Sequence, residues 1–125
     1  MTPDQIVTKF CKSFETGNVE EGLALLADDC VYHNIPLEPI KGKAAIAQTL
    51  GGFGQMLGSI TFEIRHQVAS GDVVMNERVD YFTPPGKERY GLPVTGVFEV
   101  KNGKIVAWRD YFDTRQFTQG TGLPL

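Results

Sequence analysis

Three charged residues lie where strand-like alternation places them among apolar side chains. In "VVMNERVDYF", Arg78 and Asp80 fall on the same face, because residues of equal parity along a strand point the same way. In "KIVAWRDYFD", Asp110 falls between Trp108 and Phe112 on one face. A buried ion destabilises a fold unless it is paired and hydrogen-bonded, so Asp110 requires a partner. Arg78 is the candidate, since a planar guanidinium can bridge two carboxylates.

Parity separates Asp110 from its charged neighbours. Arg109 falls on the opposite face, and Asp113 is out of phase, which favours a strand-end or solvent-facing position for that carboxylate. A structural ion pair within a sheet, or strand ends that protrude into water, would explain the same pattern without any function.

A polar pair precedes these strands in "VYHNIPLEPIKG". Tyr32 and Asn34 are two residues apart, so a strand would direct both side chains to one face. The alternative is that they are strand-end groups that satisfy the turn before Pro36.

Large apolar residues share the faces of these charges. We expect them to line a substrate pocket, although residues at such positions also form plain core. The candidate substrate-binding residues are Val74, Phe82, Trp108 and Phe112.

Three helical segments precede the main strands. The first runs from the cap at Thr2 to Gly17, and the second begins at Asn18, carries Leu26 and stops near Asp28. We expect the two to pack as a hairpin. The third, in "KGKAAIAQTLGGFGQML", has a helical apolar pattern that three glycines weaken, so a short or bent helix is expected.

Four long strands follow the helices. The first alternates through Ile60, Phe62, Ile64, His66 and Val68 and reaches a turn at "SGD". The others span about residues 73–83, 90–100 and 104–113, with a hairpin signal at Asn102-Gly103. This order predicts the α+β class, in which helices cover one face of a strongly curved antiparallel sheet.

The composition is that of a soluble globular protein. At 125 residues, with 42% apolar residues and a net charge of −3, the chain is expected to form a single domain over residues 1–125. It lacks the basic surplus of a nucleic-acid-binding protein and any apolar run that would span a membrane, so a cytoplasmic location is expected. Cys11 and Cys30 are expected to be free thiols, and His33 and His66 have no third ligand at metal spacing.

Three motifs, in order and at similar separations, carry a family resemblance. "YHNIP", "NERVDYF" and "WRDYFD", together with "GVFEV", "KNGKI" and "GLPL", closely resemble the limonene-1,2-epoxide hydrolase family over almost the whole chain. The resemblance implies a cone-shaped fold like that of nuclear transport factor 2 (SnoaL-like), with a mixed or antiparallel sheet, three to four N-terminal helices, a deep pocket and a homodimer. It also implies opening of small epoxides by water to vicinal diols, without a cofactor or metal.

The resemblance implies roles for the polar residues. The Tyr and Asn of the first motif and the Asp of the third hold a water in the family, and they match Tyr32, Asn34 and Asp110. The family's Arg-x-Asp matches Arg78 and Asp80. Our hypothesis is that ionised Asp110 takes a proton from water, while protonated Asp80 donates one to the epoxide oxygen and Arg78 lies between them.

Two other functions are compatible with the same fold. A ketosteroid isomerase or polyketide cyclase-like enzyme would use one Asp to move a proton beside a carbonyl. A noncatalytic module would bind a small molecule or dimerise without turnover.

Overall fold

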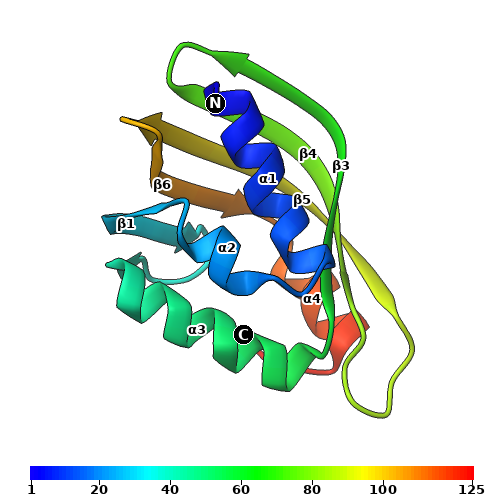
Figure 1. Ribbon diagram of the computed structural model, residues 1–125. Coiled ribbons are helices and arrows are strands. Elements are labelled where there is room, and N and C mark those ends of the chain that lie inside the picture. The colour runs from blue at the N-terminus through cyan, green and yellow to red at the C-terminus, as the bar shows by residue number, and fades with distance from the viewer.

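A computed structural model describes residues 1–125 and contains a six-stranded sheet with four helices (Figure 1). The strand order is β2-β1-β6-β5-β4-β3. In chain order the elements are α1 (Pro3–Glu15), α2 (Val19–Leu23), β1 (Leu26–Asn34), β2 (Ile40–Lys41), α3 (Lys43–Leu57), β3 (Ile60–Ser70), β4 (Val73–Phe82), β5 (Tyr90–Lys101), β6 (Lys104–Tyr111) and α4 (Thr114–Thr121).

The sheet is mixed and strongly curved. Strands β3 to β6 form the expected antiparallel meander, whereas β1 pairs with β6 in parallel. The hairpin between β5 and β6 turns at Asn102 and Gly103, which both have positive φ, as a tight two-residue turn requires. The parallel pairing places Asn34 directly beside Asp110, although the two residues are far apart in the sequence.

The N-terminal helices cover the concave face of the sheet (Figure 1). Helix α1 begins at a capping box, in which the Thr2 hydroxyl accepts from the Gln5 N–H and the Gln5 side chain accepts from the Thr2 N–H. Its apolar side chains pack against Trp108 and Phe98 in the main core. The predicted α+β class, with helices on one face of a curved sheet, is confirmed.

Several expected boundaries are wrong. Helix α2 ends at Leu23, and Leu26 and Asp28 belong to β1 instead, because the chain must extend to pair with β6. The Asn18 side chain bonds Glu21 rather than capping the backbone. Helix α3 is not short, since it continues through its three glycines for 15 residues.

Helix α4 lies outside the predicted elements. It comes from the C-terminus, so three helices precede the meander and the fourth follows it. Asp113, expected as a strand-end charge, is exposed and caps this helix, with its carboxylate accepting from the N–H groups of Arg115 and Gln116.

Two bulges break the expected alternation. In β3 the register shifts between Ile64 and His66, so His66 and Val68 are exposed and Gln67 turns to the inner face. In β6 a second shift places Ile105, rather than Val106, beside Trp108 in the core. His66 and Val68 therefore do not share the face of Phe62, as the regular alternation expected for this strand would require, and Val106 does not share the face of Trp108. None of the four helices combines the length and apolarity needed to cross a lipid bilayer.

Candidate active site

Arg78 bridges two buried carboxyl groups. Its Nε and Nη2 donate to the two oxygens of Asp80, each at 3.0 Å, and Nη2 also donates to Asp110 Oδ2 at 3.0 Å. The exposed fractions are 1% for Arg78, 4% for Asp80 and 3% for Asp110. Parity along β4 and β6 therefore correctly predicts which charges point inward.

A glycine opposite the cluster makes room for the guanidinium. Gly96 of β5 pairs with Asn76 of β4 on one side and with Asp110 of β6 on the other. A Cβ on Gly96 would overlap Arg78 Nη1 and lie 2.9 Å from Asn76 Oδ1 and 3.0 Å from Asp110 Oδ1. The absent side chain allows Arg78 to extend across β5 and reach Asp110.

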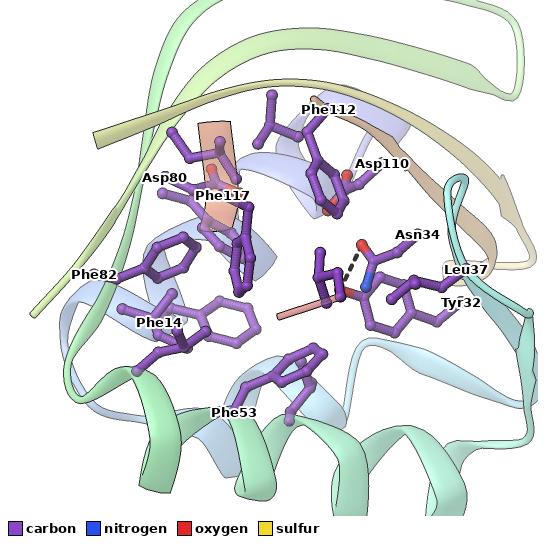
Figure 2. Close-up of a pocket in the computed structure, with 17 residues that line it drawn as sticks. Phe14, Tyr32, Asn34, Leu37, Phe53, Asp80, Phe82, Asp110, Phe112 and Phe117 are labelled. Atoms are coloured by element: carbon purple, nitrogen blue, oxygen red, sulfur yellow. Dashed lines mark hydrogen bonds between the residues drawn. The ribbon is translucent and has the colours of Figure 1, made fainter. Parts of the chain in front are cut away.

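An aromatic stack supports the second carboxylate. Trp108 Nε1 donates to Asp110 Oδ1 at 2.9 Å, and the Trp108 ring stacks on Tyr32 with centroids 3.9 Å apart. The Tyr32 hydroxyl donates to Asn34 Oδ1 at 3.1 Å. Tyr32 and Asn34 thus share one face beside Asp110, as their spacing predicts (Figure 2).

Burial and charge act on the ionisable groups in opposite directions. Burial raises the pKa of Asp80 to about 6; Arg78 opposes this shift and the charge of Asp110 adds to it. Burial would lower the pKa of Arg78, but the charges of Asp110 and Asp80 outweigh it and raise that pKa. Burial also raises the pKa of Tyr32, so its hydroxyl stays neutral.

The cluster forms part of the wall of a cavity between the sheet and the helices. The empty space inside and in front of this cavity is about 580 Å³, open solvent at the mouth included, and 14 of its 17 lining residues are hydrophobic. The other three are Asn34, Asp80 and Asp110. Figure 2 shows these polar groups facing a space that Phe14, Phe53, Phe82 and Phe117 enclose. Such a cavity suits an apolar ligand that carries one polar centre.

The four candidate lining residues divide into two pairs. Phe82 and Phe112 lie on the cavity wall. Val74 and Trp108 do not, because both are fully buried in the main core. Their expected place in the lining is therefore wrong, and Trp108 instead contacts Asp110 from behind the wall.

Not all residues at the site carry a signal in their own segment. Gly96 matters because it pairs with Asn76 on one side and with Asp110 on the other, which only the register reveals. Asn76 has the parity of Arg78 and Asp80, which would have placed it on their face. Phe117 reaches the wall from the unpredicted helix α4.

The two histidines take part in local contacts outside the cluster. His33 Nε2 lies 2.8 Å from the Leu37 carbonyl oxygen, and His66 Nδ1 lies 2.9 Å from Glu77 Oε1. Cys11 and Cys30 are free, as predicted.

A comparison with protein families decides the assignment. The model of the limonene-1,2-epoxide hydrolase catalytic domain matches residues 1–122. The chain belongs to the limonene-1,2-epoxide hydrolase family. Epoxide hydrolase EphG of Mycobacterium tuberculosis is 35% identical over 116 residues, which cover 91% of this chain and 75% of EphG. The family membership supports epoxide hydrolase activity in this chain.

Solved structures agree with this placement in the limonene-1,2-epoxide hydrolase family. An epoxide hydrolase of M. tuberculosis that resembles limonene-1,2-epoxide hydrolase (LEH-like) has a TM-score of 0.84 and 32% identity, covering 95% of this chain and 88% of that chain. A nuclear transport factor 2-like protein of unknown function from Burkholderia pseudomallei has a TM-score of 0.88 at 18% identity, covering 98% of this chain and 100% of that chain. The second likeness concerns the fold alone, which is nuclear transport factor 2-like.

Proposed function

We propose that the protein is a cofactor-independent hydrolase that converts small cyclic or acyclic epoxides, limonene-1,2-epoxide among them, to vicinal diols by one-step attack of water. The observation that carries the proposal is the Arg78 bridge between Asp80 and Asp110 in the wall of an otherwise apolar cavity. An epoxide is a strained ring whose opening releases a poor alkoxide leaving group, so it needs a proton source, and an apolar pocket suits its hydrocarbon substituents.

The polar groups beside Asp110 can orient one water. Because the Tyr32 hydroxyl donates to Asn34 Oδ1, the Asn34 Nδ2 remains able to donate to a water oxygen. The water can then donate its hydrogens to the Asp110 carboxylate and the Tyr32 oxygen. One lone pair of the water is left for attack on an epoxide carbon.

Asp80 supplies the proton in this mechanism. As the water oxygen bonds to carbon, the carbon–oxygen bond of the ring breaks, the ring oxygen takes a proton from Asp80, and Asp110 takes one from water. Arg78 with one carboxylate and one carboxylic acid is neutral, whereas two carboxylates would leave a net negative charge in a dry site. The raised pKa of Asp80 supports its role as the acid.

The decisive experiment combines an epoxide panel with isotope labelling. Purified protein should convert at least one racemic cyclic or acyclic epoxide to its diol, quantified by chiral chromatography. Single turnover in oxygen-18 water should place the label in the diol, because no ester intermediate forms. Label in Asp110 would contradict direct attack, and no turnover across the panel would contradict the function.

Replacement of the base gives a sharper test. Asp110→Asn should retain the fold and lower kcat by about 10² to 10⁴-fold, since the amide cannot take the proton from water. Circular dichroism should show the wild-type spectrum for this variant. Substantial turnover in Asp110→Asn would assign the base elsewhere.

A ketosteroid isomerase or polyketide cyclase-like activity is the competing reading of this fold. It would need one Asp but no Arg bridge between two carboxyl groups. Carbon-bound deuterium exchange into a cyclic ketone, without diol formation from any epoxide, would favour it.

We also propose a homodimer in the cytoplasm. Exposed apolar side chains on the outer face of the sheet, Val68, Met75 and Tyr111, support self-association through that face. Light scattering should give twice the mass of one 13.8 kDa chain, and a monomer at micromolar concentration would contradict the dimer.

A further inference from the structure

We propose that Asn76 and Gln67 are positioning residues, which form a hydrogen-bonded chain that holds Arg78 in the orientation that bridges Asp80 and Asp110. The chain continues to helix α1 and ends at Asp4. Its kinetic test rests on the proposed function, whereas its structural test does not.

The first hydrogen bond of the chain holds the third nitrogen of the Arg78 guanidinium. Nε and Nη2 of Arg78 donate to the two carboxyl groups, and Nη1 donates to Asn76 Oδ1 at 3.0 Å. A planar group held at all three nitrogens cannot tilt without losing a bond. Asn76 therefore helps determine how the Nη2 hydrogens divide between Asp80 and Asp110.

Asn76 must keep its oxygen toward Arg78. A guanidinium has only donors, so an amide turned by 180° would place two donors face to face. Asn76 Nδ2 donates to Gln67 Oε1 at 3.1 Å and lies 4.0 Å from Cys11 Sγ. Because Asn76 is only 2% exposed, water does not replace these partners freely, and Gln67 selects the productive amide orientation.

Gln67 is oriented in turn by helix α1. Its Nε2 donates to Asp4 Oδ1 at 2.8 Å and to Thr8 Oγ1 at 2.9 Å, which leaves Oε1 to accept from Asn76. Every link thus runs from donor to acceptor in one direction, from the Arg78 cation to the Asp4 carboxylate. The β3 bulge makes this possible, since regular alternation would direct His66 rather than Gln67 inward.

Four single variants separate positioning from stability. Asn76→Leu removes the acceptor for Arg78, and Gln67→Met removes the group that orients Asn76. Gln67→Glu keeps an acceptor for Asn76 Nδ2 but places a second carboxylate beside Asp4. Glu77→Gln is the matched control, because Glu77 is next to Asn76 and exposed on the opposite face.

The losses of kcat should not follow the losses of the unfolding midpoint across the four variants. We expect Asn76→Leu to lower kcat for epoxide hydrolysis about 10- to 100-fold with little change in KM, because a hydrogen bond to a charged group is lost. Both Gln67 variants should lower the unfolding midpoint, because Gln67→Met leaves the buried Asn76 Nδ2 without an acceptor and Gln67→Glu places two carboxylates together. Only Gln67→Met should also lower kcat, whereas Gln67→Glu should keep most of it. Glu77→Gln should change neither. In the double variant, Gln67→Met should add little to Asn76→Leu.

Hydrogen exchange of the Arg78 Nε–H, followed by NMR, tests the chain without turnover. Exchange should accelerate in Asn76→Leu and Gln67→Met but stay at the wild-type rate in Gln67→Glu and Glu77→Gln. Unchanged exchange in the first two variants, or kcat losses that follow the unfolding midpoint across the set, would overturn the chain even in an active enzyme. Absence of epoxide turnover in the wild-type protein would overturn the proposed function. The exchange test alone would then decide whether the hydrogen-bonded chain positions Arg78.

Discussion

The charges at the site were accessible from the sequence because strand alternation is a local property. Asp110 stands between Trp108 and Phe112, Arg78 and Asp80 share the face of Val74 and Phe82, and all three charged residues are buried. The resemblance, rather than parity, supplied their proposed roles. No pattern along β5 identifies Gly96, because its importance depends on the residues that lie opposite it in two neighbouring strands.

The pH dependence of turnover follows from the state of Asp80. Burial raises the pKa of Asp80 to about 6, and only the protonated form can donate to an epoxide oxygen. In the free enzyme, the ionisation of Asp80 should therefore leave kcat/KM constant below this pKa and lower kcat/KM as pH rises above it. A bound apolar substrate excludes more water and raises the pKa further, so kcat should decline at higher pH than kcat/KM.

Full pH profiles of both constants provide the measurement for Asp80. The decline on the basic side should occur at higher pH in the profile of kcat than in the profile of kcat/KM. A kcat/KM that increases steadily from pH 6 to pH 9 would show that Asp80 does not act as the proton donor.

The missing side chain at Gly96 predicts a sensitive position. Gly96→Ala would place a methyl group against Arg78 Nη1, Asn76 Oδ1 and Asp110 Oδ1, so Arg78 must move away from Asp110. We expect a loss of about 1 to 3 kcal/mol of stability, typical of overpacking, and a fall in kcat of at least about tenfold. Gly51→Ala serves as a control for the loss of a glycine, since Gly51 is exposed on helix α3, has no positive φ and has nothing within 4 Å of its missing Cβ. Normal kcat in Gly96→Ala would contradict the spatial requirement.

At the scale of elements, length and periodicity predicted the meander but not its irregularities. The bulges in β3 and β6 depend on pairing with neighbouring strands, so a pattern read along one strand directs His66 and Val106 to the wrong face. Helix α4 has only eight residues and contains Thr and Gly, which are weak helix formers. Tertiary contacts stabilise it, including the Tyr90 hydroxyl that donates to the Gln116 carbonyl.

The cap of α4 predicts a separation between binding and chemistry. Asp113→Ala removes the acceptor for two N–H groups and should cost about 0.5 to 2 kcal/mol of stability. Because α4 contributes Phe117 to the cavity wall and no polar group to the cluster, KM should rise more than kcat falls. Asp113→Asn retains a capping oxygen and should behave like the wild type. An equal fall of kcat in both variants would mean that the carboxylate itself takes part in turnover.

At the scale of the whole molecule, the order of helices and strands was sufficient for the fold class. The parallel pairing of β1 with β6 was not determined by any local signal, and it is this pairing that brings Tyr32 and Asn34 to Asp110. The cavity lies where the main core and a second apolar cluster of Leu57, Phe82, Leu92, Val94 and Phe117 approach each other. A ligand in the cavity therefore contacts both parts of the interior.

This placement predicts that ligand charge controls stabilisation of the whole protein. A neutral cyclic amide such as cyclohexanecarboxamide can bury its ring among the phenylalanines and direct its amide to Asp80 and Asp110. At a concentration about 100 times its Kd it should add about 2.7 kcal/mol to the unfolding free energy, which raises Tm measurably. Cyclohexanecarboxylate has nearly the same shape, but its anion would face ionised Asp110 in a dry cavity, so no shift is expected near pH 7. Calorimetric scans with each compound measure the difference. An equal Tm shift for both would mean that the cavity is wet enough to screen charge, and the unlike protonation states of the two carboxyl groups would then lose their physical basis.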